Sequence, residues 1–215
     1  MGLRTVIVPA RRTLLLNEAR RKTFHFLGLL LVGLYYYSTK QIVILAASLA
    51  LLASLSAEYV RLRTYPLRLF DFLVKKMLRG HERTSMAAYV YWFAGSLPVI
   101  LLLSKPLAMI TIAITLLGDT LAALVGVRFG KHRLPTNPSK SWEGTIAGTV
   151  TSFLVAILLS SLLFSAPNLP LSLVAAAAFA AVDIIRLPID DNFLMPIAIG
   201  FLLQIARLIE TGSLL

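Results

Sequence analysis

The sequence predicts an all-α, polytopic integral membrane protein with about seven transmembrane helices. Hydrophobic residues make up 58% of the 215 residues and charged residues only 14%, and the mean hydropathy is +0.81. A soluble domain has roughly 45–50% apolar and about 25% charged residues. The apolar residues also fall into separate runs near the length that crosses a bilayer, about 17–25 residues. Composition and run length therefore both favour a membrane-spanning bundle over a soluble core.

Seven apolar stretches account for the predicted helices, and residues 1–215 are predicted to form one transmembrane domain. The first and sixth stretches are short, so we expect tilt or partial burial there. The chain contains no cysteine, which excludes disulfides, Cys-ligated zinc and thiol catalysis. The predicted helices cover residues 24–38, 41–57, 85–104, 106–127, 145–165, 171–185 and 193–209.

Basic residues are concentrated on every second connection between these stretches. They crowd the N-terminal segment and the segments after the second and fourth stretches, whereas the alternate connections hold only Lys40 and Lys105. Lysine and arginine are retained on the cytoplasmic side of membrane proteins. The pattern predicts a cytoplasmic N-terminus and an external C-terminus. It also explains the net charge of +11 without nucleic acid as a partner.

The segment 58–84 mixes aromatic and apolar residues with basic ones, as in YPLRLFDFLVKKMLRG. Segments of this composition commonly lie in the plane of the lipid headgroups. We therefore predict a cytoplasmic amphipathic helix or helix pair that contacts membrane lipids. A plain solvated linker is the alternative.

Asp119 is the most informative residue because it lies about two turns inside the fourth apolar stretch. A carboxylate there costs about 2.5–3.5 kcal/mol on insertion scales and usually faces a cavity or a partner. It could form a salt bridge that joins two helices, or it could belong to a metal or substrate site, which is the more common role. The small residues around it recur every four positions and predict close helix packing: Gly118, Ala122, Gly126 and Gly130, then Gly144 and Gly148.

A basic loop, 128–144, follows the fourth predicted helix. Arg128, Lys131 and Lys140 can hold phosphate groups as point charges. The stretch NPSKSWEGT then begins a helix, whose free N–H groups suit an anion. Glu143 falls in the first turn, where the helix dipole favours an acid. Helix capping and cytoplasmic retention of charge explain the loop alone, but not its combination with Asp119 on one face.

Polar residues also precede the last predicted helix and flank the first. Asp183 lies near the end of the sixth predicted helix, and Asp190, Asp191 and Asn192 follow it. Helix capping explains the second group simply. Adjacent carboxylates beside a basic loop also suit Mg²⁺, which takes one or two carboxylates and bridges substrate phosphates. Near the N-terminus, four polar residues share one face by their helical spacing: Glu18, Arg21, Lys22 and His25.

These stretches, taken together, resemble the polyprenol kinase family, which comprises dolichol kinases, phytol kinases and CTP-dependent diacylglycerol kinases. The likeness covers almost the whole chain, and its central motif is the most specific. Asp183 is a departure, because relatives more often have Glu there. The cytidylyltransferases that make CDP-activated lipids are a related group. The stretches that carry the likeness are EARRKTFH, EYVR, GDTLAALVGVRFGKH, SKSWEGTIAG and DDNFLMP.

The resemblance implies transfer of the γ-phosphoryl group of CTP to the hydroxyl of a long-chain isoprenoid or other lipid alcohol from the bilayer. Phosphoryl transfer needs positioning and charge neutralisation more than a covalent nucleophile. Under this interpretation Asp119, Asp190 and Asp191 bind Mg²⁺ or another divalent cation, and Asp119 or Glu143 orients or deprotonates the alcohol. The expected ligands of CTP and its phosphates are Arg128, Lys131, Lys140, Asn192, Arg21, Lys22 and His25.

Other functions stay open at this point. A CTP-dependent cytidylyltransferase would release pyrophosphate, whereas a kinase would release CDP. A transporter would use Asp119 and Asp183 as an ion pathway, yet the polar residues cluster toward one face. The small-residue faces would serve contacts within one chain and in a homodimer equally well. We expect an active site that faces the cytoplasm, in the cell membrane of a prokaryote or archaeon or in an endoplasmic-reticulum-type membrane of a eukaryote.

Overall fold

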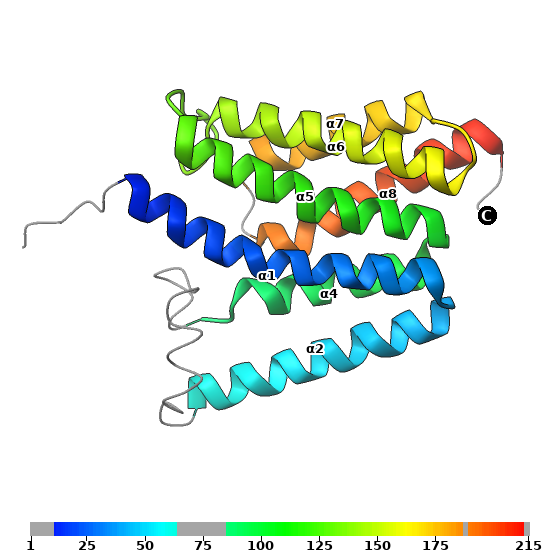
Figure 1. The fold of residues 1–215 in the computed structure, drawn as a ribbon, viewed down its shortest axis with the longest axis horizontal. Coiled ribbons are helices and arrows are strands. Elements are labelled where there is room, and N and C mark those ends of the chain that lie inside the picture. Colours follow the sequence, from blue (N-terminus) through cyan, green and yellow to red (C-terminus); the bar gives the residue numbers. More distant parts are fainter. Residues whose placement is uncertain (1–10, 64–84, 187–188, 213–215) are drawn as a thin grey trace, which may run out of the picture.

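The computed structural model describes residues 11–63, 85–186 and 189–212, and over these residues the chain forms a bundle of seven α-helices without a β-sheet. In Figure 1 the helices run side by side along the long axis, and α2 lies at one edge of the bundle. This confirms the all-α fold class. The helices are α1 (Arg11–Tyr37), α2 (Lys40–Arg63), α4 (Ala88–Leu102), α5 (Lys105–Phe129), α6 (Trp142–Leu163), α7 (Leu169–Ile184) and α8 (Asp191–Thr211).

Four of these helices, α2, α5, α6 and α8, are long and apolar enough to cross a membrane by length and composition. The apolar helices α4 and α7 are shorter, at 15 and 16 residues. At about 1.5 Å per residue, such a helix spans about 24 Å, less than the roughly 30 Å of a hydrocarbon core. The expectation of a short sixth helix is confirmed. The lengths and apolar composition of the helices are consistent with a polytopic membrane protein.

Two predicted boundaries were wrong, and both for the same reason. Helix α1 begins at Arg11 instead of residue 24, and α2 continues to Arg63 instead of ending at residue 57. Arginine, lysine and glutamate have high helix propensity, so the helices extend beyond the apolar runs on which the predictions rested. Residues 58–63 of the predicted amphipathic segment therefore belong to α2, and residues 64–84 lie outside the described part of the chain.

The outer face of α6 shows how the bundle meets its surroundings. Apolar side chains recur every four residues along this face and are 52–62% exposed. In a bilayer such a stripe contacts lipid chains, which are as apolar as leucine. The stripe consists of Ile146, Val150, Leu154, Leu158 and Leu162.

Helices α5 and α6, whose facing sides carry small residues, share the most extensive contact of any pair among the described elements. A Cβ atom at Gly144 would lie 2.6 Å from the backbone oxygen of Ala122, and one at Gly118 would lie 2.7 Å from the ring of Phe179. Neither position has room for a side chain. The predicted small-residue packing is therefore confirmed, and it fixes α5 against the helix that begins at the basic loop.

The two lysines on the weakly charged connections bind helix ends. Lys40 Nζ donates to the carbonyl of Leu103, which caps the C-terminus of α4, at 3.0 Å. Lys105 Nζ donates to the carbonyls of Tyr36, at 3.1 Å, and Ser38, at 2.9 Å, around the end of α1. Cations are stabilising at helix C-termini, where carbonyls lack intrahelical partners. These contacts explain why two cations occur on this face.

We predict that Gly144→Ala destabilises the protein by about 1–3 kcal/mol, because the added methyl group collides with the backbone of α5. The measurement is the thermal unfolding midpoint of the purified protein in detergent. Gly33→Ala is the matched control, since a Cβ atom at Gly33 meets nothing within 4 Å and alanine favours a helix over glycine. An equal or higher midpoint for Gly144→Ala than for Gly33→Ala would contradict the packing account.

Candidate active site

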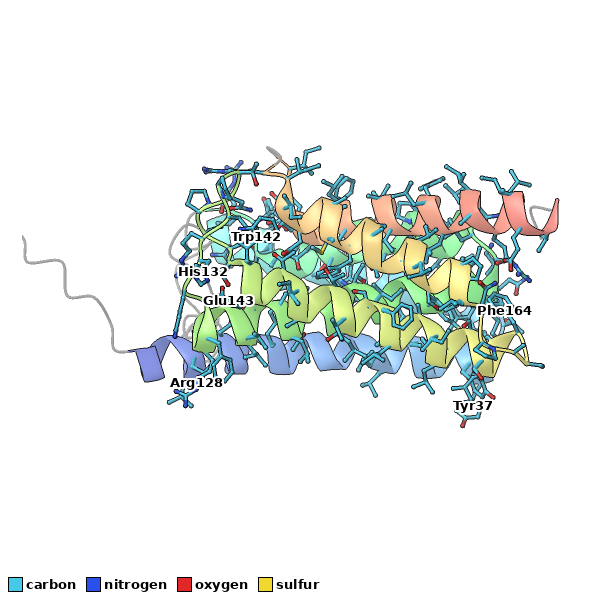
Figure 2. The ribbon with its side chains drawn as sticks, turned by 90° about the horizontal axis from the view of Figure 1, so that it is seen from above. Tyr37, Arg128, His132, Trp142, Glu143 and Phe164 are labelled. Carbon is cyan, nitrogen blue, oxygen red and sulfur yellow. The ribbon has the colours of Figure 1, made fainter. Side chains whose placement is uncertain are left out.

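The polar loop between α5 and α6 lies at one end of the bundle. In Figure 2 Arg128, His132 and Glu143 lie at this end, and Tyr37 and Phe164 lie at the other. Helices α5 and α7 end here and α6 and α8 begin here, so the predicted site residues of separate stretches approach one another as expected from the charge pattern.

Asp119 forms an ion pair with Lys22, which joins α1 to α5. Only 1% of the Lys22 side chain and 24% of the Asp119 side chain are exposed. Each charge offsets much of the cost of burying the other, and removing one partner would leave an uncompensated charge. This ion pair is one of the two roles that the sequence left open for Asp119, and the other role, in a metal or substrate site, stays a prediction. Lys22, which the sequence assigned to phosphate, contacts Asp119 in this structure.

Asp119 also lines a cleft between α4, α5 and α8, together with Asp191 and Asn192. Thr115 lies one turn of α5 before Asp119, and Met195 lies one turn of α8 after Asp191. The lining residues therefore extend from the carboxylates toward the apolar middle of the bundle. Its lining residues are Trp92, Thr115, Asp119, Asp191, Asn192, Met195 and Pro196.

The donor set of the cleft fits a magnesium ion only if a substrate completes it. Mg²⁺ is usually held by one or two carboxylates together with phosphate oxygens and waters, and Asp119, Asp191 and Asn192 supply two carboxylates and an amide. Among the described residues no group of three or more His, Cys, Asp or Glu could hold a metal by itself. Asp190 caps α8, because its Oδ1 accepts from the backbone N–H and the side-chain amide of Asn192, both at 2.9 Å.

Lys140 connects the loop to the cleft by bridging two carboxylates. Its Nζ donates to Asp183 Oδ1 at 2.8 Å and to Asp191 Oδ2 at 2.6 Å. Thr145, in the first turns of α6, donates to the other oxygen of Asp183 at 2.5 Å. The network thus ties the loop and α6 to the end of α7 and the start of α8. The sequence left the role of Asp183 open. In the structure this buried carboxylate accepts hydrogen bonds from Lys140 and Thr145.

The charge of Lys140 is secured by its neighbours. Burial by itself would lower the pKa of this ammonium group, but the carboxylates of Asp183 and Asp191 outweigh it and raise the pKa above its ordinary value of 10.5. Lys140 is therefore a cation at every physiological pH. It places one fixed positive charge at the edge of the cleft.

Glu143 binds backbone groups of the basic loop. It is not among the residues that line the cleft. Its Oε1 accepts from the backbone N–H groups of Lys131, at 3.1 Å, and His132, at 3.3 Å, and lies 2.8 Å from His132 Nδ1. Ser141 caps α6 by accepting from the N–H of Gly144 at 3.2 Å. The side chain of Glu143 thus holds the loop backbone, and the Ser141 cap fixes the start of α6.

The other cations that the sequence predicts at the site either are exposed or have side chains outside the described ones. Arg128 is exposed, and its guanidinium lies 5.8 Å from the ring centre of Phe129. The Lys131 side chain is exposed at the same end of the bundle. The side chains of Arg21 and His25 are outside the described ones, so their predicted phosphate contacts stay predictions.

Comparison with known proteins places the chain in a family. Residues 13–187 match the model of the Cytidylyltransferase family, and the chain belongs to it. The dolichol kinase of Saccharomyces cerevisiae is 31% identical over 160 residues, which cover 71% of this chain and 29% of that enzyme. A probable chloroplastic phytol kinase of Triticum aestivum is 30% identical over 162 residues, 67% of this chain and 54% of the relative.

A shorter match joins the chain to a bacterial relative. The phytol kinase of Synechocystis is 40% identical over 75 residues, 34% of this chain and 32% of the relative. No solved structure matches the chain. The chain spans less than two thirds of the length of the curated relatives it matches. The resemblance to dolichol and phytol kinases seen in the sequence is confirmed by these relatives.

We predict that Lys140→Gln destabilises the protein by about 3–5 kcal/mol, because Asp183 would keep a buried charge without a cation. The thermal unfolding midpoint in detergent measures this effect, and Lys131→Gln, at an exposed position, is the matched control. The double variant Lys140→Gln/Asp183→Asn should recover part of the loss. A midpoint of Lys140→Gln equal to that of Lys131→Gln would reject the network.

We predict that the midpoint difference between the wild type and Lys140→Gln stays constant from about pH 6 to about pH 9. The folded-state pKa of Lys140 is raised, so its contribution is complete below the unfolded value of 10.5 and is lost only as the pH rises through the folded value. Unfolding curves recorded across this range give the answer. A difference that disappears between about pH 7 and about pH 9 would show that Lys140 is not held as a cation.

Proposed function

We propose that this protein is a membrane-bound kinase that transfers the γ-phosphoryl group of CTP to the hydroxyl of a long-chain isoprenoid or similar lipid alcohol. The observation that carries the proposal is a cleft lined by two carboxylates from different helices, Asp119 and Asp191, beside a cationic loop. The names of the relatives support a polyprenol-type alcohol. The family description supports a cytidine nucleotide.

The loop supplies the charge that a nucleotide triphosphate requires. Lys140 is a fixed cation at the edge of the cleft, and Arg128, Lys131 and Arg133 present exposed cations on the same loop. Cationic side chains neutralise phosphate oxygens and hold the transferred group in position. We assign the phosphate chain of CTP to this loop, and the distribution of basic residues predicts that the loop lies on the cytoplasmic side.

A divalent cation such as Mg²⁺ fits between the nucleotide and the acidic end of the cleft. Asp119, Asp191 and the amide of Asn192 would hold it together with phosphate oxygens. When bound, the ion neutralises the charge of the phosphates. Asp190 stays a predicted further ligand, with one of its oxygens already engaged in capping α8.

The transfer step needs an alcohol oxygen, an in-line phosphorus and a base. The oxygen attacks the γ-phosphorus and forms the new O–P bond, while the bond between this phosphorus and the β–γ bridging oxygen breaks and CDP leaves with the electron pair. The proton of the alcohol passes to a carboxylate in the cleft. Asp119 is our candidate base, because Lys22 holds it in place and Glu143 is engaged with the loop.

Lipid and nucleotide reach this cleft from opposite sides. The apolar part of the cleft, with Thr115 and Met195, lies toward the middle of the bundle, and the carboxylates lie toward the loop. A lipid alcohol can enter from the bilayer with its hydroxyl foremost. We propose that its hydroxyl and the γ-phosphate of CTP meet beside Asp119 and Asp191.

A cytidylyltransferase that acts on a phosphorylated lipid is the second candidate, and the family description favours it. Its lipid phosphate would attack the α-phosphorus of CTP and release pyrophosphate. Incubation with CTP labelled at the γ-position separates the two reactions. A kinase moves the label to the lipid and leaves CDP, whereas a cytidylyltransferase leaves the label in pyrophosphate.

We predict that Asp119→Asn lowers transfer from γ-labelled CTP to phytol or a polyprenol by at least about a hundredfold, because the variant lacks the base and one candidate metal ligand. Lipid extraction and counting measure the transfer, with ATP in a parallel reaction.

Asp191→Asn tests the same cleft if the loss of the Lys22 partner prevents Asp119→Asn from folding. Glu210→Gln, near the opposite end of α8, is the control and should keep its activity. Turnover near the wild-type rate in a folded Asp119→Asn or Asp191→Asn variant would exclude that carboxylate from the reaction.

A further inference from the structure

Trp92 has a buried polar atom whose partner is missing. The side chain comes from α4, is 7% exposed and lines the cleft beside Asp119 and Asp191. Its indole Nε1 is buried and has no hydrogen-bond partner among the described residues. An indole N–H is a donor only, and buried donors in native proteins are almost always paired. This atom therefore needs an acceptor that the described residues do not supply.

The neighbouring turn of α4 carries a second atom of this kind. Ser96 is fully buried, lies four residues after Trp92 on the same helix face, and its Oγ also lacks a partner within the described chain. Several other buried hydroxyls in the bundle bond back to a carbonyl of their own helix, as Thr120 does to Leu116 at 2.6 Å and Ser152 does to Gly148 at 2.8 Å. This face of α4 thus carries two buried polar atoms that have no hydrogen-bond partner among the described residues.

Close packing holds the indole in place. A Cβ atom at Gly95, three residues after Trp92, would lie 2.4 Å from the backbone oxygen of Phe193, so α4 and the start of α8 are in direct backbone contact. A Cβ atom at Gly28 of α1 would lie 2.9 Å from Cη2 of the indole. The donor is therefore fixed relative to Asp191 and Asn192, as a recognition group must be.

We propose that Trp92 recognises the hydroxyl of the lipid acceptor: its indole N–H donates a hydrogen bond to the hydroxyl oxygen. The hydroxyl is then free to direct its own proton to the carboxylate of Asp119, which lines the same cleft. The assignment of an alcohol to this cleft rests on the proposed function. The binding step itself needs neither CTP nor transfer and can be tested alone.

This contact makes the cleft selective for an acceptor that has a lone pair. A hydroxyl oxygen can accept from Trp92 and donate to Asp119 at the same time. A protonated amine has no lone pair to offer, and a hydrocarbon has neither a donor nor an acceptor. Trp92 is thus a specificity-determining residue that distinguishes an alcohol from an apolar chain of the same length.

A phosphate oxygen of the nucleotide is the rival occupant, since it is also an acceptor. The lining of the cleft favours the lipid. The deeper lining residues, Thr115 and Met195, lie on the apolar side of the carboxylates, whereas the cations lie on the loop side. The nucleotide is therefore an alternative outcome that the experiment separates from the lipid.

The first experiment uses fluorescence. The chain has two tryptophans, so Trp142→Phe leaves Trp92 as the only indole. The variant, in detergent and without nucleotide, is titrated with phytol, geranylgeraniol and a C55 polyprenol, with phytane as the hydrocarbon control. A hydrogen bond from Nε1–H shifts indole emission to longer wavelength, so at least one alcohol should give this shift and phytane should not. Equal responses to alcohols and phytane, no response to any alcohol, or a shift with CTP alone would overturn the assignment.

The second experiment measures the two substrates separately. Trp92→Phe keeps an aromatic ring but removes the donor, so the KM for the alcohol should rise about fivefold to tenfold, with the KM for CTP unchanged. Tyr91→Phe, at an adjacent residue that does not line the cleft, is the control and should change neither. A general loss of packing would move both constants, and that result, or no change in either, would reject the role of Trp92. Absence of transfer in the wild type would reject the proposed function and leave the fluorescence result standing.

Discussion

The arrangement of this bundle depends on pairing charges at one end of the helices with partners from other segments. A charge in a low-dielectric region is costly unless an opposite charge and hydrogen bonds compensate it. Lys22 of α1 pairs with Asp119 of α5, and Lys140 of the loop bridges Asp183 of α7 and Asp191 of α8. These pairs fix the relative position of five segments. They also hold the two carboxylates, Asp119 and Asp191, that line the cleft.

The sequence predicted the helices well because apolar runs report directly on membrane-length segments. It predicted the shared face of the basic loop and the acids because charge segregates across a bilayer. It could not predict which cation pairs with which acid, since that depends on the rotation and tilt of each helix. Lys22 was thus assigned to phosphate, although it contacts Asp119, and Asp183 had no assigned partner although Lys140 binds it. Trp92 was missed because a tryptophan inside an apolar run looks like ordinary core.

The same cleft chemistry suits the two reactions that the family and its relatives suggest. A kinase and a cytidylyltransferase both need a cationic loop for the triphosphate, carboxylates near a divalent cation and a path for a lipid. They differ in the phosphorus atom that lies next to the nucleophile, γ in one case and α in the other. We propose that the buried N–H of Trp92 binds the oxygen of the lipid acceptor, and the alcohol of a kinase reaction offers such an oxygen.

The proposed reaction depends most on Asp119 and Asp191 acting together at one centre, and a bound structure tests this directly. The protein would be crystallised with Mn²⁺ and a CTP analogue that has a non-cleavable β–γ bridge, and the metal would be located by anomalous scattering. We predict a peak within coordination distance of both carboxylates and of a phosphate oxygen of the analogue. A metal peak and a triphosphate located away from this cleft would contradict the account.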